Sequence, residues 1–233
     1  MKKVLVTGAG GSIGINVIKY LLSEGKYEIT ALDLRNKNSK KRLKRYRRRI
    51  NLIYSDMNDS ILMDALVKDH DYIIHLAGIM PPIADIKHSI NEMVDYKGTE
   101  NIIKAMNMYN PNAYLLYAST TSIYGEVDKA DVNTKPNLTP LDYYSDTKLK
   151  IEKMIQHKVK NYTIIRLPLV LTNPKTGAFM YNVKLNRIVE AITDNDAGYL
   201  FVNALNHMEW YRWRNDYGYL PKYPSQCFKN IWS

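Results

Sequence analysis

The chain has 233 residues, of which 45% are hydrophobic and 24% charged, so its composition is that of a globular protein and excludes a disordered or fibrous one. Its net charge is +10, but nine lysines and arginines fall between residues 37 and 49, and the rest of the chain is close to neutral. No apolar stretch approaches the roughly 18 residues of a membrane span, and the single cysteine, Cys227, excludes an internal disulfide or a cysteine-based metal cluster and indicates a cytoplasmic protein.

Six short apolar runs in residues 1–170 are typical of buried strands. They are 4–7, 28–33, 50–54, 72–76, 113–119 and 162–166. Apolar residues with helical spacing lie between them, at 13–22, 61–66 and 102–106, and a further helix is expected from about Asp142. This alternation predicts an α/β fold with a doubly wound parallel sheet, the Rossmann fold.

Residues 171–233 have a weaker pattern and are interpreted as a shortened substrate-side region. Within it, residues 189–205 are expected to hold one more strand and a helix. The last 29 residues are rich in aromatic side chains and include all three tryptophans. The apolar residues of this aromatic tail have neither helical nor strand spacing. The sequence does not decide whether the tail packs on the core or on a partner.

The basic run between residues 37 and 49 allows two interpretations. Such a run can grip the phosphate backbone of a nucleic acid, or it can be a solvated loop and helix start between two strands. Tyr46 is its only aromatic residue, so it offers no stacking platform for single-stranded bases. We therefore favour the solvated interpretation and do not expect nucleic-acid binding.

A glycine-rich segment directly follows the first predicted strand and opens the first helix. Gly8, Gly11 and Gly14 allow a tight turn, a close approach to a pyrophosphate and close helix–strand packing. The amide groups that follow, including those of Ser12 and Ile13, would face the phosphates at a helix N-terminus. The segment predicts a dinucleotide site.

Asp33 lies 19 residues beyond Gly14, at the end of the second predicted strand. A carboxylate there accepts hydrogen bonds from the adenosine ribose and repels a 2′-phosphate, which favours NAD over NADP. Arg35 and the basic run weaken this preference, because a cation can neutralise the phosphate.

Further cofactor-contacting residues are expected at the ends of the next two strands. Asp56, with Met57 beside it, follows the third strand and is placed to accept from the adenine amino group or to cap the next helix. Leu76, Ala77 and Gly78 end the fourth strand and leave room for the cofactor. We interpret His75 as a packed histidine at the strand end and not as a catalyst.

These motifs occur in a set order. The later ones are Gly98-Thr99, Tyr117-Ala-Ser-Thr-Thr-Ser-Ile-Tyr-Gly125 and Tyr144-Ser-Asp-Thr-Lys148. Over about residues 3–205 the chain resembles the extended short-chain dehydrogenase/reductase family, the NAD-dependent epimerase/dehydratase group. The resemblance implies a nicotinamide cofactor and a small-molecule substrate, with a sugar nucleotide as the expected class. It also implies a homodimer formed through the helix that bears Tyr144 and the helix before it.

Tyr144 and Lys148 are the expected catalytic pair. Four residues apart on a helix, they lie one turn apart on the same face. An ammonium group beside a phenol favours the phenolate, so Tyr144 can exchange a proton with a substrate hydroxyl. By resemblance, Lys148 also reaches the nicotinamide ribose. The family's hydroxyl residue lies four positions before the tyrosine of the Tyr-Gly pair, which here is Thr120.

Departures from the family pattern limit the inferred activity. Thr121 and Ser122 stand where sugar 4,6-dehydratases carry two carboxylates, so we do not expect that dehydration. Asp95 replaces an asparagine expected near the cofactor, and Leu169 replaces one that galactose-type epimerases use for the sugar nucleotide. The chain is also shorter than usual for the family, mainly in the region that grips the substrate.

The leading hypothesis is an NAD-dependent oxidoreductase resembling nucleotide-sugar epimerases, which exchanges hydride with a secondary alcohol through Tyr144, Lys148 and Thr120. The alternatives are a one-way NAD(P)-dependent carbonyl reductase or alcohol dehydrogenase, and a non-catalytic dinucleotide-binding protein.

Overall fold

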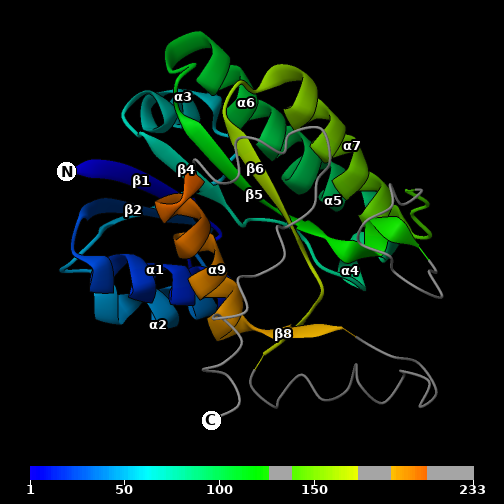
Figure 1. Cartoon of the computed structure of the whole chain (residues 1–233), viewed down its shortest axis with the longest axis horizontal. Coiled ribbons are helices and arrows are strands. Elements are labelled where there is room, and N and C mark those ends of the chain that lie inside the picture. Colours follow the sequence, from blue (N-terminus) through cyan, green and yellow to red (C-terminus); the bar gives the residue numbers. More distant parts are fainter. Residues whose placement is uncertain (126–137, 173–189, 209–233) are drawn as a thin grey trace.

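Six parallel strands form the centre of the fold in the computed structural model, which describes residues 1–125, 138–172 and 190–208 (Figure 1). The strands are β1 (Lys2–Thr7), β2 (Tyr27–Asp33), β3 (Asn51–Tyr54), β4 (Tyr72–His75), β5 (Tyr114–Thr120) and β6 (Tyr162–Leu167). Their order in the sheet is β3-β2-β1-β4-β5-β6. The chain therefore winds outward in both directions from β1, which confirms the predicted Rossmann architecture. Most of the aromatic tail, with Cys227, lies outside the described residues.

Helices cover both faces of this sheet (Figure 1). One face carries α1 (Ser12–Glu24), α2 (Lys37–Leu43) and α9 (Asp194–Asn206), and the other carries α3 (Ser60–Lys68), α6 (Gly98–Tyr109) and α7 (Tyr143–Lys158). Each face has its own hydrophobic cluster, because alternate side chains of a strand point to opposite sides of the sheet. Within the described ranges, no helix combines the length and apolar character that crossing a membrane requires.

Several shorter elements connect these layers. They are the 3₁₀ helices η1 (Lys44–Tyr46) and η3 (Thr121–Tyr124), the short helices α4 (Ile83–Ile86) and α5 (His88–Asn91), and the π-helical segment η2 (Glu92–Lys97). The basic run forms α2 and η1 and the residues after them, between β2 and β3. This agrees with its interpretation as a helix start between two strands.

The predicted strand and helix after residue 189 are confirmed. β8 (Ala191–Thr193) pairs in parallel with β7 (Leu169–Leu171) in a separate two-stranded sheet, and α9 follows at once. α9 buries Phe201 in the same cluster as β1 and α1. At Gly198 a Cβ atom would stand 2.5 Å from the Cβ atom of Asn16, so the absence of a side chain lets α9 lie directly against α1. A division of the chain at residue 170 stays a prediction.

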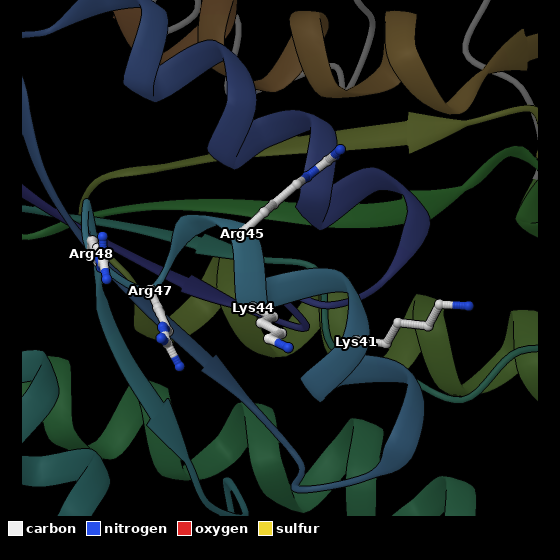
Figure 2. A pocket seen from close by; sticks show the side chains of 5 residues that line it. All are labelled: Lys41, Lys44, Arg45, Arg47 and Arg48. Atoms are coloured by element: carbon white, nitrogen blue, oxygen red, sulfur yellow. The ribbon is translucent and has the colours of Figure 1, made fainter.

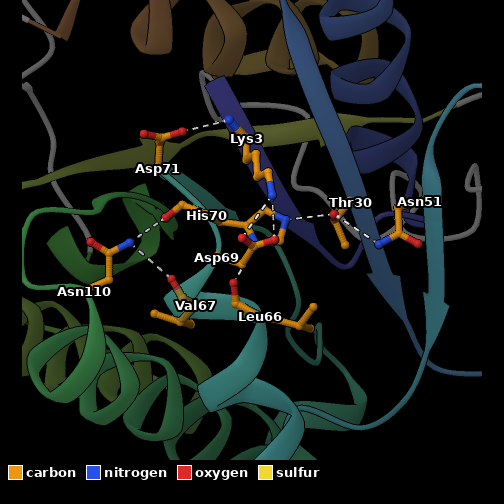
Figure 3. Close-up of polar contacts among 9 residues, drawn as sticks. All are labelled: Lys3, Thr30, Asn51, Leu66, Val67, Asp69, His70, Asp71 and Asn110. Carbon is orange, nitrogen blue, oxygen red and sulfur yellow. Dashed lines mark hydrogen bonds and ion pairs between the residues drawn. The ribbon is translucent and has the colours of Figure 1, made fainter. Parts of the chain in front are cut away.

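A polar network closes the amino-terminal edge of the sheet (Figure 3). Asp71 accepts from the backbone N–H of Lys3, and the Lys3 ammonium pairs with Asp69 at 2.8 Å. Buried His70 hydrogen-bonds the Leu66 carbonyl through Nδ1 and the Thr30 hydroxyl through Nε2. Burial lowers the pKa of His70, so it is neutral at pH 7 and serves the fold at the edge opposite the candidate site.

Candidate active site

The glycine-rich loop lies between β1 and α1, at the carboxyl edge of the sheet. Gly8 has a φ of +66°, and a Cβ there would stand 2.7 Å from the Ala77 nitrogen. A Cβ on Gly14 would stand 2.4 Å from the Gly8 carbonyl oxygen. Side chains at these two positions would therefore force the loop away from β4 and from α1. Gly11 caps α1 without a side-chain hydrogen bond, which leaves the first amides of the helix, those of Ser12 and Ile13, facing outward from its N-terminus.

Asp33 lies beside this loop, as predicted from its spacing. Its Oδ2 atom accepts from the Gly10 backbone N–H at 2.6 Å, while Arg42 of α2 donates to the Gly10 carbonyl at 3.1 Å. Burial raises the pKa of Asp33, and the Gly10 and Leu34 amides and the Arg42 charge oppose that rise. The carboxylate therefore fixes the loop through Oδ2, at the edge of the sheet where a ribose would lie.

The structure places Asp56 and Met57 differently from each other. Asp56 is exposed after β3, and its Oδ1 atom accepts from the backbone N–H of Asn58 at 2.9 Å. The Met57 side chain is buried against Gly98 at the start of α6, and its carbonyl accepts from Asn101. Only Asp56 therefore presents a side chain to the open edge, and Met57 has its backbone amide alone to offer a ligand.

His75 is fully buried at the end of β4 between two hydroxyl groups. Its Nδ1 atom lies 2.7 Å from Thr7 Oγ1, and its Nε2 atom lies 2.9 Å from Thr99 Oγ1. Thr99 already donates to the carbonyl of Asp95, so it must accept from Nε2–H, and Thr7 donates to Nδ1. Burial, helped by the charge of Lys148, lowers the pKa of His75 to about 3. A neutral histidine of fixed tautomer cannot act as a general base near pH 7 here, in agreement with its interpretation as a packed residue.

The segment after β4 is held close to the glycine loop. The Leu76 amide donates to the Thr7 carbonyl, and the Ala77 amide donates to the Thr7 hydroxyl. Gly78 is exposed, and a Cβ on it would stand 2.7 Å from Asp95 Oδ1 and 3.2 Å from Lys148 Nζ. The segment therefore borders both the loop and the predicted catalytic lysine.

Local sequence fixes the start of α7 and so the place of Tyr144. Asp142 caps the helix by accepting from the Ser145 backbone N–H at 2.7 Å, and the Ser145 hydroxyl closes the capping box. The Tyr144 amide donates to Asp85 of α4 at 2.9 Å. Its phenol is buried and donates to Met80 Sδ at 3.5 Å, a weak acceptor that leaves the hydroxyl available to a stronger one.

Lys148 lies one turn farther along α7 on the same face, as predicted. Its ammonium is 5.7 Å from the centre of the Tyr144 ring and 5.0 Å from that of Tyr117. Burial raises the pKa of Tyr144 and the charge of Lys148 lowers it, so the lysine acts in the direction that favours a phenolate. The structure thus brings the predicted pair together in a buried position.

Asp95 is a partner of Lys148 that the sequence did not reveal. The two side chains, both almost fully buried, form an ion pair of 3.1 Å, and the second carboxylate oxygen accepts from the Ile79 amide at 2.7 Å. Burial lowers the pKa of Lys148, but the effects of Tyr117, Asp95 and Tyr144 outweigh burial and leave this pKa well above its ordinary value. Because burial also raises the pKa of Tyr117, that phenol is neutral at pH 7, and Asp95 is the negative charge that faces the Lys148 ammonium.

Thr120 ends β5 and begins η3. Its hydroxyl accepts from the Ser122 amide at 3.1 Å and donates to the Ser122 hydroxyl, and no hydrogen bond joins it to Tyr144 in the described part of the chain. The neighbouring Ser119 hydroxyl is buried and has no partner among residues 1–125, 138–172 and 190–208. Strand alternation puts Ser119 on the same side of β5 as Tyr117, the side covered by α7.

A second buried ion pair supports this corner. Arg166 of β6 donates to Glu152 of α7 through Nε and Nη2, the latter at 2.6 Å, and its Nη1 atom donates to the Tyr124 hydroxyl at 2.8 Å. One guanidinium therefore ties α7, β6 and η3 together. The sequence pattern gave no signal for this role of Arg166, because its partners lie 14 and 42 residues away.

The described residues fit a dinucleotide. The glycine positions form a cradle that any Cβ would fill, and the α1 N-terminus carries no capping side chain. Asp33 holds its carboxylate against the Gly10 amide beside this cradle, and the buried Ser119 hydroxyl lacks a partner among the described residues. All of these groups lie at the carboxyl edge of the sheet, where open α/β folds bind their ligands.

Comparison with known proteins agrees with this geometry. Residues 4–212 match the family described as NAD dependent epimerase/dehydratase. The chain belongs to this family. Among relatives of this epimerase/dehydratase-family protein are the UDP-glucose 4-epimerases of Halalkalibacterium halodurans, 27% identical over 65% of this chain and 44% of the relative, and of Lactobacillus helveticus, 26% identical over 70% of this chain and 50% of the relative. The chain thus spans about half the length of these relatives.

Solved structures of epimerases share the fold of this family member. The UDP-Glc/GlcNAc 4-epimerase of Campylobacter jejuni matches with a TM-score of 0.75 at 20% identity, over 90% of this chain and 75% of that one. The UDP-glucose 4-epimerase of Thermus thermophilus, solved as a complex with NAD, matches with a TM-score of 0.72 at 20% identity, over 87% of this chain and 74% of that one. These likenesses confirm the predicted fold.

Proposed function

We propose that this epimerase/dehydratase-family protein binds NAD and exchanges hydride with a secondary alcohol, with Tyr144 as the acid–base residue. The observation that carries the proposal is the buried Tyr144 phenol beside the Lys148 ammonium, next to a glycine cradle that fits a pyrophosphate. NAD, when bound, supplies a hydride acceptor. The protein supplies proton transfer and orientation.

In the proposed reaction, Tyr144 removes the proton of the substrate hydroxyl as the carbinol hydrogen leaves as hydride. The positive charge of Lys148 stabilises the phenolate that accepts this proton. Thr120 has a hydroxyl at the end of β5 that can turn from Ser122 to bond the substrate oxygen. In the reverse direction Tyr144 returns the proton, so the same residues serve an epimerase and a reductase.

A sugar nucleotide is the substrate we propose. The UDP-glucose 4-epimerases named above and the CDP-paratose 2-epimerase of Salmonella typhi, 27% identical over 61% of this chain, support this class. The one-way alternative is supported by likeness to the D-erythronate dehydrogenase of Haemophilus influenzae, 25% identical over 74% of this chain. A homodimer through α6 and α7 and a cytoplasmic location stay predictions from the sequence.

Absorbance of NADH during substrate screening separates these functions. The protein is first titrated with NAD, with quenching of its tryptophan fluorescence as the signal, and then incubated with UDP-sugars and simple secondary alcohols. An epimerase converts its substrate with no net NADH, whereas a dehydrogenase forms NADH in proportion to product. NAD binding without turnover of any substrate would favour the non-catalytic alternative, and absence of NAD binding would refute the proposal.

A further inference from the structure

The basic run lies beside the cofactor loop, where Arg42 donates to the Gly10 carbonyl. All nine of its lysines and arginines are exposed, and within the described residues none of them forms an ion pair with a carboxylate. Five of them line a hollow of about 460 Å³ in α2, η1 and the turn that follows (Figure 2). These are Lys41, Lys44, Arg45, Arg47 and Arg48. We name this the α2–η1 basic surface.

The fold holds this surface in place. Leu43 is fully buried in the core cluster between the cations, and the Asn36 side chain caps α2 by accepting from the Asn38 and Ser39 amides. Arg45 lies 4.8 Å from the centre of the Tyr46 ring. The positive groups are therefore carried by an ordered helix and turn that keep them together despite their repulsion. Without an anion, such a density of like charge disfavours the folded state.

The direction of the side chains indicates the shape of the ligand. In Figure 2 they fan out from the helix and the turn instead of converging on one point, with Arg45 and Lys41 pointing away from Arg47 and Lys44. A single compact anion would meet only part of this set. An extended chain of negative groups could reach the five side chains in succession.

The chemistry of the surface favours phosphate. Four consecutive basic positions around Tyr46 are arginines, whose planar guanidinium groups bind phosphate oxygens in pairs. No large apolar side chain is exposed between residues 37 and 49, so the surface has nothing to insert into a bilayer. Tyr46 is half-buried, which leaves no platform for base stacking and hence no means of reading sequence.

The sequence alone favoured a solvated helix start here, but the shared hollow changes that interpretation. We propose that the α2–η1 basic surface binds an extended phosphate chain without sequence preference, supplied either by a nucleic-acid backbone or by inorganic polyphosphate. This site is separate from the Tyr144 site and does not depend on the proposed activity. Arg42 is left out of it, because it already donates to Gly10 of the cofactor loop.

The test compares two triple variants of the full chain that lose the same charge. Lys44, Arg47 and Arg48 are replaced by Gln in the first, which leaves Arg42 and Arg45 with their contacts. Lys68, Lys153 and Lys158, exposed on α3 and α7, are replaced by Gln in the control. Anisotropy of a fluorescein-labelled oligothymidylate and calorimetry with inorganic polyphosphate give the affinities between about 50 and 200 mM salt. Over this range, binding through phosphate contacts weakens strongly as the salt concentration rises.

Five phosphate contacts to a single strand predict a slope of log K against log salt of about −3.5, or about a hundredfold loss of affinity over this range. Each phosphate contact contributes about 0.7 to the magnitude of the slope, so the first variant, which lacks three cations, should have a slope smaller by about 2. It should also bind about a hundredfold more weakly near 0.1 M salt. The control should bind like the unmodified protein. Binding of only one of the two probes identifies the source of the phosphate chain.

Several results would overturn the proposal. These are no binding of either probe at the lowest salt, equal weakening in both variants, and binding that the first variant leaves unchanged. Binding confined to phosphatidylserine vesicles would also overturn it, because that surface presents headgroups and not a chain. Circular dichroism checks the fold, and if the first triple variant unfolds, Arg47→Gln against Lys153→Gln gives the same comparison with one contact.

Discussion

Replacing Asp95 by Asn keeps the shape of the side chain and removes the charge that faces Lys148. The amide oxygen of Asn can still accept from the Ile79 amide, so the backbone contact of 2.7 Å can persist. The ammonium of Lys148 then has no carboxylate at 3.1 Å, and its charge acts on Tyr144 without an opposing one. We therefore expect Asp95→Asn to lower the pKa of Tyr144.

The size of the effect follows from the distances. Lys148 Nζ lies 3.1 Å from the Asp95 carboxylate and 5.7 Å from the Tyr144 ring centre, so the carboxylate is within about 9 Å of that ring. At an effective dielectric constant of about 20, two unit charges about 9 Å apart interact by roughly 2 kcal/mol. Since about 1.4 kcal/mol corresponds to one pKa unit, the pKa of Tyr144 should fall by about 1 or slightly more.

Carbon-13 NMR of protein labelled at tyrosine Cζ measures this pKa without a substrate. Tyr144→Phe identifies the Tyr144 resonance, which is then followed through an alkaline titration in the unmodified protein and in Asp95→Asn. Other charged groups around Tyr144 are Asp142 at the start of α7 and Asp85 of α4, and both are kept. Asp146→Asn is the matched control, because Asp146 lies on α7 but is partly exposed and pairs with Lys150.

An unchanged or higher pKa of Tyr144 in Asp95→Asn would refute this reasoning. It would mean that Lys148 has lost its proton together with its partner. The variant should also lose roughly 3–5 kcal/mol of unfolding free energy, the usual cost of leaving one member of a buried ion pair alone. Urea denaturation measures that loss, and a loss below about 1 kcal/mol would show that the pair is not buried in solution.

Two further predictions concern groups outside this pair. Asp33→Ala should reduce the preference for NAD over NADP by roughly tenfold, about the contribution of one hydrogen bond to a charged group. Fluorescence titrations with both cofactors measure this preference. Tighter binding of NADP than of NAD by the unmodified protein would contradict the role of Asp33. Burial lowers the pKa of His70 and of His75 below the unfolded value of about 6.5. The stability that their neutral forms confer is therefore complete above about pH 6.5 and is lost as the pH falls below it. Each histidine changes the free energy of unfolding by up to about 1.4 kcal/mol per pH unit. Urea denaturation between about pH 7 and 5 measures this dependence, and His70→Gln should make it weaker by the contribution of one histidine. His157→Gln, at an exposed site, is the control and should leave the pH dependence unchanged. The same pH dependence of the unfolding free energy in the unmodified protein and both variants would contradict the role given to His70.

The strands, most helices and the glycine loop could be predicted because each depends on residues close together in the chain. Runs such as Val4–Thr7 and the spacing of Gly8, Gly11 and Gly14 have a local physical cause. Tyr144 and Lys148 share a helix face for the same reason, so their proximity needed no tertiary information.

The groups that surround this pair could not be predicted, because they reach it from distant elements. Asp95 was visible only as a departure from a family pattern, and its contact with Lys148 depends on how η2 packs against α7. The link from Arg166 to Glu152 and Tyr124 likewise joins three elements. The charge of the basic run could be read from the sequence, but its arrangement could not. Which cations line one hollow depends on how α2 and η1 fold.

Activity of Tyr144→Phe tests the proposed chemistry most directly, once NADH or product assays have found a substrate. The change removes one oxygen whose only described contact is Met80 Sδ, so the fold and NAD affinity should be nearly unchanged. The rate should fall by about 10²–10⁴-fold, the usual contribution of a general acid–base group. Thr120→Ala should cost less, and Lys148→Ala should damage both rate and NAD binding. If Tyr144→Phe keeps more than about a tenth of the activity, against that factor, Tyr144 is not the acid–base residue.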